Sequence, residues 1–299
     1  MCRAGRLRSE AGGCIFIARI EVYTNNQLPD LRSCTAVISG ASQGVGRGIA
    51  VSLGEAGATV YLTGRNRTAL ESAAAQVTER GGRGIGILCD HAVDAQVEAL
   101  FQRVREKQSR IDLLVNNVWG GYEAHPQGLG MGPFWELGLE DWDAMFTRGL
   151  RAHFVSSRLA VPLMLPHKRG LIVNTIAWAE GKYLRHLYYD VVKQAIVRMA
   201  YGMALELKPH QVAAVAIAPG FVRTERVMAA HAGHPFDLGG TESPEYIGRA
   251  VVHLAADPKV MTLTGQVLTV GQLAREYGFT DADGRQPPPF QMPPGMALD

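Results

Sequence analysis

Short apolar runs alternate along the chain with longer stretches in which apolar residues recur every three or four positions. Compact apolar runs are typical of buried β-strands, and the periodic stretches indicate amphipathic helices. We predict strands at 34–38, 58–63, 84–89, 111–116, 171–176, 212–218 and 266–270. We predict helices that begin at 45 and then span about 66–80, 93–109, 139–165, 186–208 and 243–256. This alternation predicts an α/β fold, a single Rossmann-type doubly wound parallel sheet of about seven strands with helices on both faces.

The alternating elements occupy residues 33–272, which we interpret as one nucleotide-binding domain. Residues 1–32 precede the first strand, and their apolar run at 15–18 is too short for a signal peptide core or a membrane span. We expect a poorly ordered N-terminal extension there. A transit peptide and a start codon placed too far upstream are the alternatives. Residues 273–299 form a C-terminal tail.

Composition and charge narrow the class of protein. With 299 residues, 47% of them hydrophobic and 19% charged, the chain can bury a large core without a disulfide or a metal ion. A net charge of +2 argues against a nucleic acid or an anionic membrane as partner. Three histidines in loop-like sequence, at 125, 231 and 234, form no metal-ligand pattern.

The four cysteines show no Cys-x-x-Cys pair and no framework spacing; they are Cys2, Cys14, Cys34 and Cys89. Cys34 and Cys89 fall in predicted buried strands. We therefore expect reduced thiols in a cytoplasmic protein.

A glycine-rich turn follows the first strand. Gly40, Gly44 and Gly46 stand in the order Gly-x-x-x-Gly-x-Gly, between the strand at 34–38 and the helix that begins at 45. Glycines let the backbone approach a phosphate closely, and the helix N-terminus directs N–H groups at it. A dinucleotide diphosphate is the ligand this pattern favours, and a simple tight turn is the alternative.

Polar residues follow several other strands, at the sheet edge where ligands bind in such folds. Arg65 follows the second strand, where an acidic residue would bind the ribose diol of NAD, and a guanidinium there favours the 2′-phosphate of NADP. A solvated arginine at a helix start is the alternative. Asp90 follows the third strand, Asn117 the fourth and Thr224 the sixth. Asp90 can meet an adenine or cap the next helix.

Tyr189 and Lys193 stand four residues apart in a predicted helix and so share one face. A phenol with a pKa of about 10 exchanges protons poorly at neutral pH. A cation about 5 Å away is worth roughly two pKa units at an effective dielectric near 20. We therefore predict that Lys193 makes Tyr189 a usable general acid or base.

Taken together, these motifs resemble those of the short-chain dehydrogenase/reductase family in order and spacing. The resemblance covers about 33–272 and rests on the glycine loop at 40–46, Asn116-Asn117, Tyr189-x-x-x-Lys193 and Pro219-Gly220-x-Val222-x-Thr224. The tail at 273–285 is similar to that of the subgroup containing dehydrogenase/reductase member 1. The resemblance implies an NAD(P)-dependent oxidoreductase that moves a hydride between nicotinamide and a carbonyl or alcohol carbon.

The resemblance also implies a role for each matching residue. Tyr189 would exchange the proton with the substrate oxygen, and Lys193 would lower the pKa of Tyr189 and hold the nicotinamide ribose. The other cofactor contacts would be Gly40, Ser42, Gln43 and Gly46 at the diphosphate, Asp90 at the adenine, Asn117 at the adjoining ribose and Thr224 at the carboxamide. We expect a preference for NADP(H), with NAD(H) as the other cofactor to consider.

Two positions depart from the family's pattern. The family has a serine twelve or thirteen residues before the tyrosine, where this chain has Ala177 and Ile176. Thr175 is the nearest hydroxyl, but in a regular strand it points to the opposite face from Ile176. Tyr188 and His186 are further candidates for the missing donor.

Gly149 is the second departure, since it stands where the family has a catalytic asparagine. The subgroup with the similar tail also has glycine there. Close helix packing is the alternative explanation for a glycine inside a helix.

Two loops bear on the substrate. The aromatic-rich stretch from Trp119 to Trp135 forms either a wall over an apolar substrate or a loop that buries its own rings. Segment 225–242 is rich in glycine, and we expect a mobile substrate lid in which Met228 and Phe236 contact substrate or pack in the core.

We predict an NADP-preferring oxidoreductase that acts on a carbonyl or secondary alcohol. The alternative is an NADP-binding regulator or scaffold that has lost efficient turnover, because the serine is absent. The long apolar faces of the helices at 139–165 and 186–208, together with the family resemblance, favour a homodimer or homotetramer.

Overall fold

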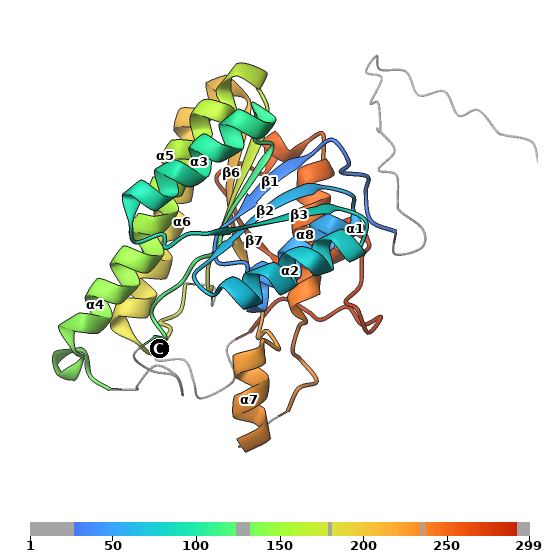
Figure 1. Cartoon of the computed structure of the whole chain (residues 1–299). Helices are drawn as coiled ribbons and strands as arrows, with labels where there is room; N and C mark the ends of the chain where they lie inside the picture. The colour runs from blue at the N-terminus through green and yellow to red at the C-terminus, as the bar shows by residue number, and fades with distance from the viewer. Residues whose placement is uncertain (1–26, 124–131, 179–180, 234, 236, 292–299) are drawn as a thin grey trace, which may run out of the picture.

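The sheet predicted from the sequence is present in the structure, a computed structural model that describes residues 27–123, 132–178, 181–233, 235 and 237–291. Within these residues seven parallel strands lie in the order β3-β2-β1-β4-β5-β6-β7 (Figure 1). The strands are β1 Thr35–Ile38, β2 Thr59–Gly64, β3 Arg83–Leu88, β4 Leu113–Asn116, β5 Gly170–Thr175, β6 Val212–Ala218 and β7 Val267–Thr269. The predicted fold class is confirmed.

Helices connect the strands and cover the sheet. The α-helices are α1 Gly44–Glu55, α2 Arg67–Glu79, α3 Asp94–Gln108, α4 Leu139–Met145, α5 Ala152–Ala160, α6 Leu187–Leu207, α7 Glu225–Gly233, α8 Pro244–Ala256 and α9 Val270–Tyr277. A π-helical segment, η2 Phe146–Arg151, joins α4 to α5. Short 3₁₀ helices are η1 Phe134–Glu136, η3 Val161–Leu163, η4 Leu165–His167, η5 Lys208–His210 and η6 Val260–Thr262.

The core has two main layers, one on each face of the sheet. Helices α1, α2 and α8 cover one face, and α3, α5 and α6 cover the other (Figure 1). Alternation within β1 follows from the strand pleat, since Ala36 and Ile38 enter the first layer and Val37 the second. Because both faces are covered, every residue of β1, β4, β5 and β6 is buried.

The helix predicted at 139–165 is interrupted. Helix α4 passes into the π-helical segment, and α5 ends at Ala160, just before Pro162, which cannot donate a helical hydrogen bond. Gly149 lies inside the π-helical segment. Periodicity alone could not show this, because a π-turn adds one residue without changing the apolar character of the segment.

Segment 225–242, where we expect a mobile substrate lid, forms helix α7 in its first half. The hydroxyl oxygen of Thr224 accepts a hydrogen bond from the backbone N–H of Val227, and Glu225 stands in the first turn near the positive end of the helix. Met228 is partly exposed on this helix. Phe236 lies outside the described residues, as do His125 and His234.

The described part of the C-terminal tail packs against the body, starting with a helix, α9, that we did not predict. Gly278 ends α9 in the left-handed conformation. The Phe279 ring then stacks on His253 of α8 at 5.1 Å between centroids, and Tyr246 donates a hydrogen bond to the carbonyl of Pro287 at 3.2 Å. The described part of the tail thus packs against α8 and stabilises its position.

The predicted core cysteines, Cys34 and Cys89, are buried free thiols, and burial raises the pKa of each to about 12. Cys2 and Cys14 lie outside the described residues. Among the described residues, no helix combines the length and the apolar character needed to cross a membrane, and no group of histidine, cysteine and acidic residues could hold a metal ion.

Helices α1 and α8 pack with their backbones in contact, which requires glycine on both. A Cβ atom on Gly48 would overlap the backbone of Pro244, and one on Gly248 would lie 2.6 Å from the carbonyl oxygen of Gly48. We expect Gly48→Ala to lower the free energy of unfolding by about 1–3 kcal/mol in urea titrations. Gly202→Ala in α6 is the control, because a Cβ there meets no atom within 4 Å and should stabilise the helix by up to about 1 kcal/mol. Equal stability of Gly48→Ala and wild type would contradict the backbone contact.

Candidate active site

A cavity of about 520 Å³ opens at the carboxyl ends of β1 to β4, where ligands bind in parallel α/β sheets. This volume is in the range typical of small-molecule sites. The predicted cofactor residues that line it are Gly40, Ser42, Gln43, Arg65, Asp90, Asn117 and Thr224. The structure therefore brings together positions that are far apart in the sequence.

The glycine loop needs its glycines for two reasons. Gly40 and Gly44 have φ values of +67° and +55°, in the left-handed region that other residues rarely adopt. A Cβ on Gly46 would lie 2.5 Å from the side-chain nitrogen of Asn117 and would overlap the carbonyl oxygen of Gly40. Helix α1 therefore begins in direct contact with the ends of β1 and β4.

The N-terminus of α1 already binds a carboxylate of the chain itself. Gln43 precedes the helix without a side-chain cap, and the backbone N–H of Gly44 donates instead to Oε2 of Glu225 in α7, at 2.9 Å. Arg47 pairs with the other oxygen of the same carboxylate at 2.8 Å. This is the anion-binding position predicted for a diphosphate, and it attracts negative charge as the helix dipole requires.

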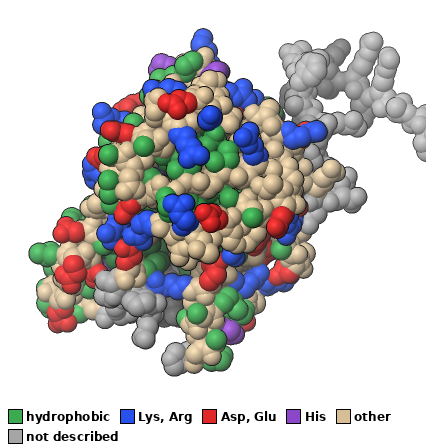
Figure 2. All heavy atoms as spheres, viewed as in Figure 1, with side chains coloured by type: hydrophobic (Ala, Val, Ile, Leu, Met, Phe, Trp, Pro, Cys, Tyr) green, Lys and Arg blue, Asp and Glu red, His purple; other side chains and the backbone are tan. Residues whose placement is uncertain are grey.

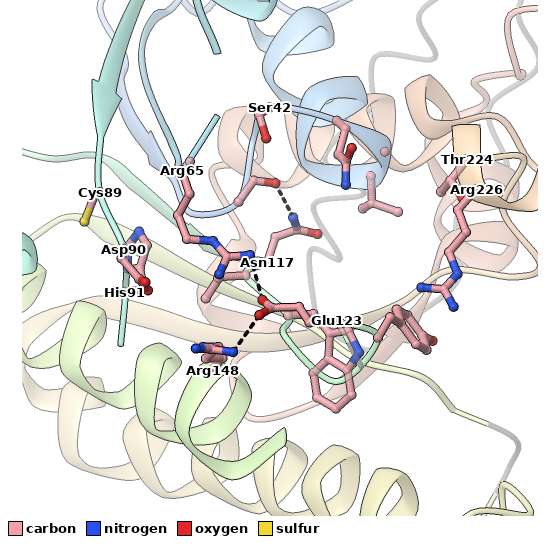
Figure 3. A pocket seen from close by; sticks show the side chains of 18 of the residues that line it. Ser42, Arg65, Cys89, Asp90, His91, Asn117, Glu123, Arg148, Thr224 and Arg226 are labelled. Carbon is pink, nitrogen blue, oxygen red and sulfur yellow. Dashed lines mark hydrogen bonds and ion pairs between the residues drawn. The ribbon is translucent and has the colours of Figure 1, made fainter. Parts of the chain in front are cut away.

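A second carboxylate meets Arg65. Glu123 lies between Arg65 and Arg148, with its two oxygens 2.6 Å and 2.5 Å from their guanidinium nitrogens (Figure 3). All three side chains are about a third to a half exposed, so solvent weakens these ion pairs. One carboxylate between two guanidinium groups leaves this corner of the cavity with net positive charge.

The side chains of Asn117 and Asp90 both form hydrogen bonds with the backbone. Asn117 bonds to the glycine loop, and Asp90 bonds within a turn after β3. The Asn117 amide donates to the carbonyl oxygen of Gly40 at 3.0 Å, and its own oxygen accepts from the Thr175 hydroxyl at 3.4 Å. Asp90 accepts from the backbone N–H of Ala92 at 2.9 Å while facing the cavity. Both thus have a structural role in addition to the predicted ligand role.

Tyr189 and Lys193 lie on one face of α6, as predicted. The side chain of His186 caps the helix by accepting from the backbone N–H of Tyr189 at 3.3 Å. The ammonium of Lys193 is buried, 5.5 Å from the centre of the Tyr189 ring and 4.1 Å from the centre of the Trp119 ring. The indole therefore holds the cation beside the tyrosine.

The pKa values in this cluster differ from our expectation. Burial, together with the neighbouring Tyr122, holds the pKa of Tyr189 well above 10, whereas we expected Lys193 to lower it. Burial also lowers the pKa of Lys193 itself to about 7, so near neutral pH only part of the lysine population carries the charge that would act on the phenol.

The family model described as short chain dehydrogenase matches residues 34–234. The chain belongs to the short-chain dehydrogenase family. Members of this family are NAD(P)-dependent oxidoreductases, and the predicted family is confirmed.

Individual relatives cover most of the chain. Dehydrogenase/reductase SDR family member 1 from Mus musculus is 38% identical over 267 residues, 85% of each chain, which confirms the predicted subgroup. A 3-oxoacyl-(acyl-carrier-protein) reductase from Synechocystis is 30% identical over 246 residues, 80% of this chain and 96% of that protein. Among solved structures, an NAD(P)-dependent dehydrogenase from Beutenbergia cavernae with NADP bound at low occupancy is 27% identical, with a TM-score of 0.69 over 81% of this chain and 96% of that chain.

The family's serine has no direct substitute among the residues we considered. Ile176 packs in an apolar cluster, and the hydroxyl of Thr175 turns to the carbonyl of Asn116 and the side chain of Asn117. Tyr188 donates its hydroxyl proton to the carbonyl of Leu137 at 3.3 Å. The nitrogen Nδ1 of His186 serves as the cap of α6.

The glycine at the family's asparagine position has a clear packing reason. Gly149 is buried, and a Cβ atom there would lie 2.8 Å from Cζ3 of Trp119. The indole that holds Lys193 thus fills the space of the side chain that Gly149 lacks. The Trp119 indole therefore packs where it does because position 149 has no side chain.

Sequence reasoning assigned no role to Glu123 and Arg148, which line the cavity, and placed Tyr122 and Glu225 only within the aromatic-rich stretch and the lid segment. Each lies in a loop or helix whose approach to the cavity depends on the whole fold. A local signal existed only for Glu225, which follows Thr224 at a helix start.

The buried lysine should make stability depend on pH. The pKa of Lys193 is about 7 in the folded protein and about 10.4 in an unfolded chain. Between these values the unfolded chain binds more protons, so wild-type stability should rise with pH. We expect Lys193→Met to lose about 2 kcal/mol of unfolding free energy relative to wild type between pH 7 and pH 9.

Urea titrations at pH 7, 8 and 9 measure this difference. Lys107→Met, on the exposed surface of α3, is the control and should follow the wild-type pH profile. If Lys193→Met also followed it, the burial of the ammonium would have no energetic consequence and the assignment would be wrong.

Proposed function

We propose that the protein is an NADP-preferring short-chain dehydrogenase that transfers a hydride between nicotinamide and a carbonyl or secondary alcohol. The observation that carries the proposal is that Tyr189 and Lys193 both pack against Trp119, which lines the same cavity as the glycine loop. A phenol and an ammonium next to a dinucleotide site are suited to proton exchange with a substrate oxygen.

The cradle fits a dinucleotide. Gly40, Ser42, Gln43 and Gly46 would surround the diphosphate at the N-terminus of α1, where the backbone N–H of Gly44 now donates to the chain's own Glu225 carboxylate. Asp90 would meet the adenine, Asn117 and Lys193 the nicotinamide ribose, and Thr224 the carboxamide. When bound, the cofactor supplies the hydride to the carbonyl carbon.

Tyr189 would give its proton to the substrate oxygen as negative charge develops there. Its pKa is too high for a free phenolate at neutral pH, which suits a general acid in carbonyl reduction. Lys193 stabilises the charge left on Tyr189, because its ammonium lies beside the ring in a buried site where Coulomb forces are strong.

The proposed NADP preference rests on charge. Arg65 and Arg148 share one carboxylate, whereas an adenosine 2′-phosphate brings nearly two negative charges to the same corner. NAD(H) lacks this phosphate. It would leave Glu123 paired with the two arginines and would gain no electrostatic stabilisation from them.

A noncatalytic NADP-binding regulator is the second candidate function. The observation in its favour is that Ile176, Ala177 and Thr175 offer no hydroxyl directed at Tyr189. Both candidates predict cofactor binding, so only turnover that depends on Tyr189 separates them.

Location and assembly are part of the proposal. Reduced buried thiols fit a cytoplasmic protein. Acidic and basic side chains intermingle over the face shown in Figure 2. An apolar hollow of about 480 Å³ between η2, α5 and α6 is lined by Phe146, Leu150, Phe154 and Met199 among others, and would be the contact of a homodimer or homotetramer.

The rings of Trp119 and Tyr122 favour an apolar substrate.

Replacing Arg65 should change cofactor preference. We expect Arg65→Gln to weaken NADPH binding about tenfold, the loss of about 1.4 kcal/mol, and to leave NADH binding within about twofold. Titrations of intrinsic fluorescence with each cofactor measure both constants. Arg67→Gln is the control, since Arg67 pairs only with Glu71 on the surface of α2 among the described contacts. Equal weakening of both cofactors would contradict a 2′-phosphate site.

Replacing Tyr189 tests catalysis itself. We expect wild-type protein to oxidise NADPH with members of a panel of aldehydes, ketones and quinones, and Tyr189→Phe to lose about 10²- to 10⁴-fold of that turnover. Tyr201→Phe, an exposed tyrosine on the same helix, should retain it. Tight NADPH binding without turnover on any panel member would reject the enzyme and favour the noncatalytic regulator.

A further inference from the structure

A hydroxyl that the sequence did not single out lies beside Tyr189. The rings of Tyr122 and Tyr189 are stacked, with 6.4 Å between centroids and 30° between planes. Trp119 packs edge-on against both, at 6.1 Å and 5.3 Å. Tyr122 also lines the cavity, so its phenol reaches the space that a substrate would enter.

The two phenols are hydrogen-bonded to each other. A phenol carries one proton and can also accept, so only one of the two protons lies between the two oxygens. The pair therefore has a second proton to donate to a third group in the cavity that Tyr122 lines.

A cation strengthens Tyr122 as a donor. The guanidinium of Arg226, which points from α7 into the cavity, lies 4.2 Å from the centre of the Tyr122 ring (Figure 3). Its charge opposes the effect of burial on the pKa of Tyr122. A phenol under a positive charge donates a stronger hydrogen bond.

The preceding glycines explain how Tyr122 reaches this place. A Cβ on Gly121 would lie 2.6 Å from Cζ2 of Trp119 and 2.7 Å from the side chain of Met145. A Cβ on Gly120 would lie 2.5 Å from the side chain of Arg148. Two glycines thus allow the chain to fold closely around the indole and return toward Tyr189.

We propose that Tyr122 is a catalytic residue, which donates to the substrate oxygen the hydrogen bond that the family's serine provides. The inference rests on the proposed function and explains how this chain would work with Ile176 and Ala177 at the serine position. Both tyrosines would then act on the same substrate oxygen. Tyr189 would give it a proton, and Tyr122 would donate a hydrogen bond to it.

The reduction then balances with the cofactor already proposed. NADPH would supply the hydride: a C–H bond of its reduced nicotinamide would break, oxidising the cofactor to NADP⁺, a C–H bond would form at the carbonyl carbon, and the π electrons of the C=O bond would move to its oxygen. The O–H bond of Tyr189 breaks and its proton goes to that oxygen, which leaves a phenolate to be reprotonated from solvent. Tyr122 keeps its proton throughout and stabilises the developing oxyanion.

Tyr122→Phe removes the hydroxyl and keeps the ring that packs on Trp119 and Arg226. With the best member of the carbonyl panel, we expect kcat to fall about 10²-fold while the Kd for NADPH stays within about twofold. Tyr188→Phe is the matched control, because it removes the hydroxyl of another largely buried tyrosine, which donates to the carbonyl of Leu137. Its kcat should stay within about threefold of wild type.

The outcomes separate this inference from the proposed function. Turnover that is lost in Tyr189→Phe but retained in Tyr122→Phe overturns the role of Tyr122 and leaves the enzyme intact. A large loss in both supports it, provided that the thermal midpoint of Tyr122→Phe matches that of Tyr188→Phe. Absence of turnover in wild type rejects the proposed function.

A second measurement tests the phenol pair without turnover. Protein labelled with 3-fluorotyrosine gives a ¹⁹F resonance for Tyr189, which Tyr189→Phe assigns. We expect Tyr122→Phe to shift this resonance, because the hydrogen-bond partner of Tyr189 is gone. An unchanged resonance would show that the two phenols are not paired and would overturn the inference.

Discussion

The contact between the start of α1 and the ends of β1 and β4 constrains the rest of the site. Asn117 is its centre, since its amide holds the carbonyl of Gly40 and its oxygen accepts from Thr175. Gly46 must lack a side chain for this contact to form. The same bonds fix the N-terminus of α1 as an anion site and take up the hydroxyl of Thr175, the nearest one to the family's serine position. One packing requirement thus builds the cofactor cradle and removes a catalytic candidate.

The aromatic cluster lowers the free-energy cost of burying the ammonium of Lys193. An ammonium removed from water needs compensation, and the face of Trp119 gives part of it at 4.1 Å. The indole fits because position 149 is glycine. Trp119 and Gly149 together therefore fill the volume next to the lysine. The incomplete compensation appears as a pKa of about 7 for Lys193.

Local sequence patterns carried most of the fold and about half of the site. Apolar runs predicted the strands, and the spacings around Gly40 and Tyr189 predicted the cradle and the pair on α6, because each depends on neighbours within one turn or one helix. The cavity positions of Tyr122, Glu123 and Arg148 depend on how loops and η2 cross the sheet edge, which no local period encodes. Helix α9 was missed for another reason: Gly278, its stop signal, was considered only as part of the tail.

The charged side chains around the cavity affect the free energy with which any dinucleotide would bind. Glu225 sits on the N-terminus of α1, and Glu123 sits between Arg65 and Arg148. On the proposed function these are the positions of the diphosphate and of the 2′-phosphate. Binding is then an exchange of carboxylates for phosphates, and its free energy is the difference between two sets of ion pairs. The diphosphate as a whole and the 2′-phosphate each bring more charge and more acceptor oxygens than one carboxylate, so the exchange favours the phosphates, and it does so most at the corner that holds two guanidinium groups.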